Sequence, residues 1–268
     1  MPSRSAAIAV LAAVAVSAAC ASSEASNGAE STPDPAASAE GGTVAATGGA
    51  TQDDQEAPNR LSEAEAAEGF ELLFDGESLE AWRGYGRDDI PAGWRAVDGA
   101  LAYEPGAGGG DIITRDTFTD FDLRLEWKVE PSGNSGVMYG VVEGPEWSYH
   151  SGPEMQVLDN SGHADGGNPL TSAGAAYGLY APSADVTRPV GDWNEARIVR
   201  RGNRVEHWLN GTRIVEYEIG TGEWEALIAG TKFAQWPDFG AHHEGHIALQ
   251  DHGDRVSFRN LRIRRLVP

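Results

Sequence analysis

Short runs of alternating apolar and polar residues, separated by turn residues, constrain the fold of this chain more than any other feature. The clearest run, residues 121–129, places Leu123, Leu125, Trp127 and Val129 on one face and charged residues on the other. Successive side chains of a strand point to opposite faces, so this pattern predicts a half-buried strand. Helical periodicity is nearly absent after Phe70, and we therefore expect an all-β domain.

Further strands follow the same pattern and indicate how the sheets are built. They are expected at residues 134–142, 196–200, 204–209, 245–251 and 255–263. The turn residues at 131–133 and 251–254 predict hairpins between the strands that flank them, and Asn210-Gly211 predicts a tight turn in a meander. About a dozen strands with one apolar face each favour two antiparallel sheets packed as a sandwich.

The aromatic residues mark where the folded domain begins. All eight Trp, seven Tyr and seven Phe lie at or after Phe70. Residues 21–69 are mainly Ala, Gly, Ser, Thr, Glu and Asp, a composition that cannot bury enough apolar surface to offset the entropy of ordering it. We therefore expect a disordered acidic tether over residues 21–69 and one folded domain over residues 70–268.

The first 20 residues have the pattern of an export signal. Arg4 is followed by an apolar run over residues 6–16 that is too short to span a membrane and by small residues before Cys20. Cys20 is the only cysteine, so it has no disulfide partner in the chain. The segment resembles a bacterial lipoprotein signal, although Ser17 stands where Leu is usual. We expect a periplasmic or outer-membrane lipoprotein, lipidated at Cys20 and so anchored to the membrane, with plain secretion as the alternative.

The charge of the chain bears on its partners. The formal net charge is −21 at pH 7. An acidic surface repels phosphate backbones, so nucleic acid is a poor partner. A neutral carbohydrate ligand is compatible with this charge.

One strand carries polar residues where packing would favour apolar ones. In residues 152–160, alternation places Glu154 and Gln156 on the same face, with Asp159 on the opposite one. If that face is a concave sugar-binding surface, Glu154 is a candidate acid or base. If the face is merely solvated, the pair has no special meaning.

A second polar cluster lies near the C-terminus. Alternation directs Gln250 and His252 away from the core, and His252 is a candidate acid or base that Asp251 or Asp254 could orient. The alternative for His252 is a turn histidine that bonds a backbone carbonyl. The nearby residues 242–246 contain three histidines and Glu244, which could hold a metal or form a solvated loop.

Other polar and aromatic residues allow both structural and functional interpretations. Glu126 lies on the polar side of an amphipathic strand and could be only that, whereas His207 shares its face with apolar residues and is expected to be a satisfied core histidine. The long loop at residues 161–184 is typical of a site or a lid. The tryptophans that could stack on a sugar are Trp94, Trp147, Trp193 and Trp236.

Together these segments identify a family resemblance. The segments that carry it are residues 73–79 with Trp82, 110–112, 126–128, 133–137, 152–160, 177–180, 190–194, 207–211 and 246–253. Over roughly residues 70–266 the chain resembles the bacterial 3-keto-disaccharide hydrolase domain, formerly called domain of unknown function 1080. The resemblance implies a concanavalin-like jelly roll, which agrees with the expected sandwich.

The resemblance also implies cleavage of glycosides that carry a ketone at C3. Such a ketone acidifies the C2 proton, so a base can remove it and expel the C1 leaving group, and adding water back gives net hydrolysis. We expect Glu154 and His252 to supply acid and base. Lys232 or a divalent cation would stabilise the enolate. The residues expected to hold sugar hydroxyls are Asn134, Gln156, Gln250 and Glu126. The alternative is a carbohydrate-binding module without catalysis.

Overall fold

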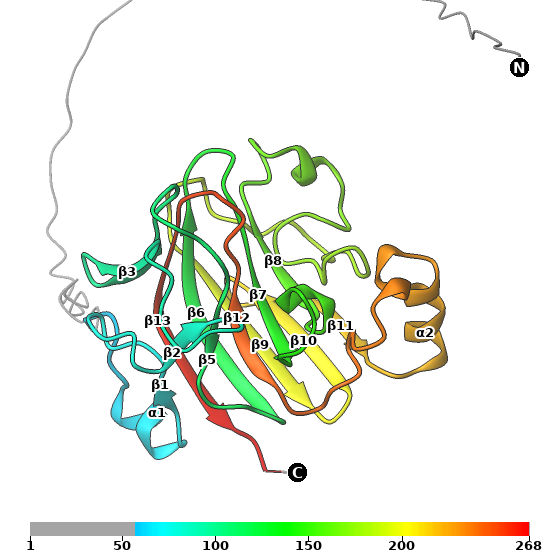
Figure 1. Ribbon diagram of the computed structural model, residues 1–268, viewed down its shortest axis with the longest axis horizontal. Helices are drawn as coiled ribbons and strands as arrows, with labels where there is room; N and C mark the ends of the chain where they lie inside the picture. Colours follow the sequence, from blue (N-terminus) through cyan, green and yellow to red (C-terminus); the bar gives the residue numbers. More distant parts are fainter. Residues whose placement is uncertain (1–56, 268) are drawn as a thin grey trace, which may run out of the picture. The chain divides into compact units, whose positions relative to one another are not determined.

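The computed structural model describes residues 57–267, which form two antiparallel sheets packed face to face (Figure 1). The all-β jelly-roll prediction is confirmed. The larger sheet has eight strands and runs in the order β11 (Thr212–Glu218), β10 (Arg204–Leu209), β9 (Asn194–Arg201), β6 (Phe121–Val129), β13 (Val256–Arg265), β4 (Ala100–Tyr103) and β3 (Trp94–Val97), with β1 (Glu71–Leu72) also paired to β13. The predicted meander forms β9, β10 and β11.

The smaller sheet has five strands and carries the polar strand noted above. Its order is β2 (Trp82–Gly84), β5 (Ile112–Thr114), β12 (His246–Leu249), β7 (Asn134–Val141) and β8 (Glu154–Leu158). β8 is therefore an edge strand. Its partner β7 places Met138 opposite Glu154 and Gly136 opposite Gln156.

Short helices lie in the connections between strands. They are α1 (Glu63–Ala67), α2 (Gly222–Ala229) and the 3₁₀ helices η1 (Ser148–His150), η2 (Ala164–Gly167) and η3 (Lys232–Gln235). Thr221 caps α2 by accepting a hydrogen bond from the Trp224 backbone N–H. Within residues 57–267, none of these helices has the length and apolar character that a membrane crossing would need.

The core lies between the inner faces of the two sheets. On β6, Leu123, Leu125, Trp127 and Val129 are all buried, as the alternation predicted. Each such side chain contributes roughly 1.5–3 kcal/mol by leaving water. Their burial fixes the outward direction of the residues between them.

Two predicted hairpins are wrong. The turns at residues 131–133 and 251–254 do not join paired strands, because β6 and β13 belong to the larger sheet whereas β7 and β12 belong to the smaller one. Each turn instead carries the chain across the edge of the sandwich. Alternation determines which face of a strand is buried but does not determine its neighbour.

His207 links the two sheets through polar atoms in the core. The residue is fully buried, its Nε2 lies 2.9 Å from the Tyr139 hydroxyl on β7, and its Nδ1 lies 3.1 Å from the Gly174 carbonyl. Burial lowers the pKa of His207 to about 4, so the ring is neutral near pH 7. The prediction of a satisfied core histidine is confirmed.

The ordered structure begins before the predicted boundary at residue 70. Asn59 is 5% exposed and donates from Nδ2 to the Gly99 carbonyl at 2.7 Å, while its Oδ1 accepts the Asn260 N–H at 2.8 Å. Glu65 of α1 accepts a hydrogen bond from Arg262 at 2.5 Å. Specific polar contacts, rather than aromatic packing, hold residues 57–69 to the sheet. Residues 1–56, including Cys20, lie outside the described part of the chain.

We expect Asn59→Ala to lower the free energy of unfolding by about 2 kcal/mol. The substitution removes two side-chain hydrogen bonds, and it places alanine at a φ of 63°, which asparagine tolerates better. Chemical denaturation of purified protein measures the change. Glu77→Ala, at an exposed position, is the control, and equal stability of both variants would contradict this account of the N-terminal contacts.

Candidate active site

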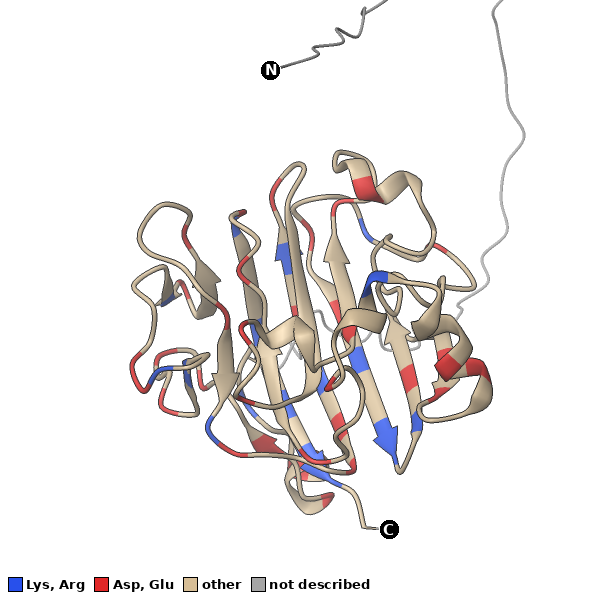
Figure 2. Ribbon diagram, turned by 45° about the vertical axis from the view of Figure 1, so that its right-hand side comes forward, with Lys and Arg blue, Asp and Glu red and all other residues tan. Residues whose placement is uncertain are grey.

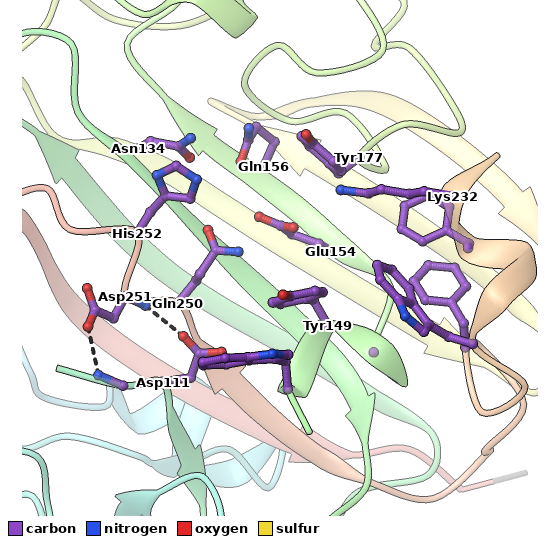
Figure 3. A pocket seen from close by; sticks show the side chains of 16 residues that line it. Asp111, Asn134, Tyr149, Glu154, Gln156, Tyr177, Lys232, Gln250, Asp251 and His252 are labelled. Atoms are coloured by element: carbon purple, nitrogen blue, oxygen red, sulfur yellow. Dashed lines mark hydrogen bonds between the residues drawn. The ribbon is translucent and has the colours of Figure 1, made fainter. Parts of the chain in front are cut away.

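The outer face of the smaller sheet forms the floor of a pocket of about 630 Å³ (Figure 3). This volume lies within the range of small-molecule sites. Loops and η3 build its walls. The side chains and backbone that line it are Gly110, Asp111, Asn134, Trp147, Tyr149, Gly152, Glu154, Gln156, Tyr177, Lys232, Phe233, Trp236, Phe239, Gln250, Asp251 and His252.

Gly136 organises the floor of the pocket. It lies opposite Gln156 on β8, and on its other side its carbonyl accepts the Gln250 N–H at 3.0 Å. A Cβ atom at position 136 would overlap the Glu154 carboxyl group. Because glycine has no side chain, the carboxyl group can lie against the strand between the two glutamines. The predicted shared face of Glu154 and Gln156 is therefore present.

The surroundings of Glu154 favour its protonated form. Removal from water and, to a smaller extent, the nearby Asp111 carboxylate raise the pKa of Glu154, the Lys232 ammonium lowers it, and the resulting pKa is about 8. The side chain keeps partial exposure toward the cavity, so a ligand can reach it. The pocket thus holds a carboxylic acid that is largely protonated at neutral pH.

Three amide side chains line the pocket with unused acceptors. Asn134 and Gln156 are 2% and 1% exposed. The side-chain oxygens of Asn134, Gln156 and Gln250 are buried and have no hydrogen-bond partner among residues 57–267. A buried polar atom without a partner costs about 1–3 kcal/mol, so such atoms call for a ligand or water.

Asp111 is a second, half-buried carboxyl group of the pocket that the sequence did not single out. It precedes β5, accepts the Asp251 N–H at 2.9 Å and accepts a hydrogen bond from the Ser148 hydroxyl. Burial raises the pKa of Asp111. In the sequence, Asp111 is a single aspartate between a glycine-rich loop and an apolar strand. Many aspartates in such positions only cap turns, so this pattern alone does not identify a site residue.

His252 lines the pocket from the loop after β12 and is exposed to solvent. Figure 3 shows its ring beside Asn134. The expectation that Asp251 or Asp254 orients this ring is wrong. Asp251 instead accepts the N–H groups of Gly110 at 2.7 Å and Gly253 at 2.8 Å, and neither carboxylate bonds the His252 ring within the described structure.

Lys232 enters the pocket from η3. Its Nζ lies 4.7 Å from the centre of the Tyr177 ring, and Figure 3 shows the side chain extending from the wall toward the cavity. Tyr177 comes from the long loop that the sequence associated with a site. The loop also supplies the Thr171 carbonyl, which accepts from Gln156 Nε2 at 3.2 Å.

The structure distinguishes the four tryptophans that could stack on a sugar. Trp147 and Trp236 line the pocket, and Trp147 is 48% exposed. Trp94 is 3% exposed and belongs to the core. Trp193 lies outside the pocket, with the Arg259 guanidinium 4.2 Å from its ring centre.

The structure does not bring Glu126 into this pocket. Glu126 is on the outer side of the larger sheet, where Arg259 Nε and Asn260 Nδ2 donate to its carboxylate at 2.7 and 2.6 Å. Figure 2 shows the Lys and Arg residues interspersed with Asp and Glu. The expectation that Glu126 holds sugar hydroxyls together with the pocket residues is wrong, since β6 directs its polar side away from the smaller sheet.

The histidines at residues 242–246 do not converge on one point. His242 pairs with Asp238, His243 with Asp120, and His246 Nδ1 lies 3.2 Å from the Asp116 carbonyl. Across residues 57–267, no three His, Cys, Asp or Glu side chains are grouped as metal ligands would be. The structure therefore supports the alternative of a loop with separate polar contacts.

Comparisons with known proteins agree with this fold. A 3-keto-disaccharide hydrolase of Bacteroides thetaiotaomicron is 36% identical over 228 residues, which cover 74% of this chain and 79% of that protein. Two crystal structures from Parabacteroides distasonis, of proteins assigned as glycosyl hydrolases, are also similar. The first has a TM-score of 0.74 at 32% identity and covers 78% of this chain and 100% of that one. The second has a TM-score of 0.58 at 26% identity and covers 74% and 99%.

The sequence also matches a family definition over almost the whole described domain. Residues 69–264 match the 3-keto-alpha-glucoside-1,2-lyase-like domain. The match includes all the strands of both sheets apart from the last residue of β13. The chain therefore belongs to the family of the 3-keto-alpha-glucoside-1,2-lyase-like domain.

Proposed function

We propose that this protein is an enzyme that cleaves the glycosidic bond of 3-keto-glycosides. Family membership and a relative named 3-keto-disaccharide hydrolase support this function. The observation that carries it is the position of Glu154, a largely protonated carboxyl group in one pocket with His252, Lys232 and three buried amides. Elimination from a keto-sugar needs an acid, a base and a group that stabilises an enolate.

The first step of the proposed reaction removes the C2 proton of the sugar. The His252 imidazole takes this proton, and the C–H electron pair moves into the C3 carbonyl to form an enolate. Lys232 lines the pocket with its Nζ beside the Tyr177 ring and supplies positive charge there. An ammonium group stabilises the developing negative charge on the enolate oxygen.

The second step breaks the bond to the leaving group. The C3 carbonyl re-forms, a C1–C2 double bond appears, and the leaving oxygen takes the Glu154 proton as the C1–O bond breaks. Water can then add across the double bond, giving its proton to Glu154 while the His252 imidazolium returns a proton to C2. This sequence is net hydrolysis and restores both residues, whereas release before water addition is lyase chemistry.

The three amides give the pocket its affinity for a polyhydroxylated ligand. Sugar hydroxyls can donate to the unpartnered oxygens of Asn134, Gln156 and Gln250. These contacts would replace the hydrogen bonds that the buried oxygens lack in the free protein. They also fix the ring so that C2 and C1 face the acid and base.

A carbohydrate-binding module without catalysis explains the pocket less well. Neutral sugar recognition uses amides and aromatic rings, both of which are present. It has no need for a buried carboxyl group whose ionisation is opposed by its surroundings. Binding of unoxidised sugars without turnover of keto-sugars would favour this second function.

We also propose that the protein is exported and anchored to the cell envelope. The support is the sequence of residues 1–20, with an apolar run and small residues before Cys20. Lipidation at Cys20 would place the acidic residues 21–56 between the membrane and the enzyme.

Glu154→Gln should lower kcat/KM for a 3-keto-disaccharide at least about 100-fold, because glutamine cannot donate the proton to the leaving oxygen. His252→Ala should cause a loss of similar size, since it removes the imidazole that takes the C2 proton. Release of free sugar, measured by product analysis, gives the rates. Circular dichroism verifies that both variants are folded.

Glu126→Gln is the matched control for Glu154→Gln, because Glu126 is a strand glutamate outside the pocket. Its activity should stay within about twofold of the wild type. His246→Ala is the corresponding control for His252→Ala. Full activity of both Glu154→Gln and His252→Ala would refute the assigned roles.

Cys20→Ser should abolish membrane association if the N-terminus carries a lipid. The expected result is loss of metabolic palmitate labelling and release of the protein into the soluble fraction of expressing bacteria. Activity of the released protein should be unchanged, because the pocket is built from residues 110–252. Equal labelling of both proteins would exclude Cys20 as the lipidated residue.

A further inference from the structure

Polar and aromatic side chains occupy different parts of the pocket. Figure 3 shows Glu154 between the side of Asn134 and His252 and the side of Tyr149, and the Lys232 side chain reaches from the wall toward the middle of the pocket. The unpartnered amide oxygens identify the first side as the place for sugar hydroxyls. If the keto-sugar lies there, the group that leaves C1 extends past Glu154 toward the aromatic side.

Trp147 is the most exposed aromatic residue of the pocket lining. It is 48% exposed, and its ring stacks on Tyr149 at an interplanar angle of 7° and a centroid distance of 6.3 Å. Tyr149 in turn packs edge to face with Trp236 at 5.5 Å. The Trp147 ring therefore presents a large apolar surface to the cavity and is held by its packing against Tyr149. Such a surface is suited to stack on the face of another ring.

The backbone next to Trp147 is firmly held. Ser148 is fully buried, donates its hydroxyl to Asp111 and lies 3.4 Å from the Met138 sulfur. Ser148 begins η1, which also carries Tyr149. Ser148, which lies between Trp147 and Tyr149 in the chain, is thus anchored to the Asp111 carboxyl group, and this anchor holds the backbone of both aromatic residues in place before a ligand binds.

We propose that Trp147 and Tyr149 form a platform for the leaving group, and that the enzyme prefers leaving groups with a flat ring. This inference rests on the proposed function and adds a substrate class to it. A pyranose ring and an aryl ring share the apolar face that such a platform recognises. A methyl leaving group has no such face and would not reach Trp147.

Three 3-keto-α-glucosides that differ only in the leaving group test this inference. The leaving groups are glucosyl, 4-nitrophenyl and methyl. Trp147→Ala should lower kcat/KM about tenfold for the two ring-bearing substrates, mainly through KM, and less than threefold for the methyl glycoside. Trp147→Phe should recover most of the loss. A loss with the aryl substrate alone would restrict the platform to aryl groups.

Trp208→Ala is the matched control, because Trp208 lies on the larger sheet, with Arg197 over its ring and no contact with the pocket. It should leave all three rates unchanged. Equal losses for all three substrates in Trp147→Ala, or no loss for any, would overturn the platform. If the wild type converts none of them, the proposed function fails, and the platform fails with it.

Discussion

The packing of two sheets against each other determines where this protein can place its chemistry. Each sheet buries one face, and the core between them is filled by apolar side chains such as Trp127, Phe258 and Leu249. Asn134 of β7 and Glu154 and Gln156 of β8 point instead to the other side of the smaller sheet, where they line the pocket. That face would be solvated, but η1, η3 and the loop at residues 161–184 cover it and create the pocket.

The pocket acts on Glu154 through the loss of water. Removing a carboxylate from water is unfavourable unless hydrogen bonds or cations compensate for the lost hydration, and here the nearest strand residue is Gly136, which offers only backbone. The carboxyl group consequently keeps its proton. The same exclusion of water that suits the pocket to a neutral sugar therefore also keeps the proton on Glu154. This proton is the one that the proposed reaction transfers to the leaving oxygen.

The sequence was sufficient to predict the fold class and several of the polar side chains that line one pocket, for a physical reason. Alternation states which side chains share a face, and it correctly grouped Glu154 with Gln156 and separated the core residues of β6 from Glu126. Alternation does not state which strands are neighbours. The strands before and after residues 131–133, and those before and after residues 251–254, were therefore expected to pair in one sheet, whereas they belong to different sheets. Glu126 points away from the core, as Glu154 does, but β6 belongs to the larger sheet, and alternation does not state to which sheet a strand belongs.

Two further features depend on contacts between distant residues and could not be predicted from local patterns. Asn59 is held by Asn260, which is 201 positions away, and so residues 57–69 join the domain without any aromatic residue. Asp111 faces Glu154 only because Ser148 and the Asp251 backbone fix it there. Such contacts follow from the completed topology and not from the composition of either segment.

The central claim is that the surroundings of Glu154 keep it protonated at neutral pH, and titration of its side-chain carbon by ¹³C nuclear magnetic resonance tests this most directly. The signal that disappears in Glu154→Gln identifies the residue. We predict a titration midpoint near 8, far above the ordinary value of 4.5. A midpoint near 4.5 would show that Glu154 is ionised in the working enzyme and would contradict its role as the acid.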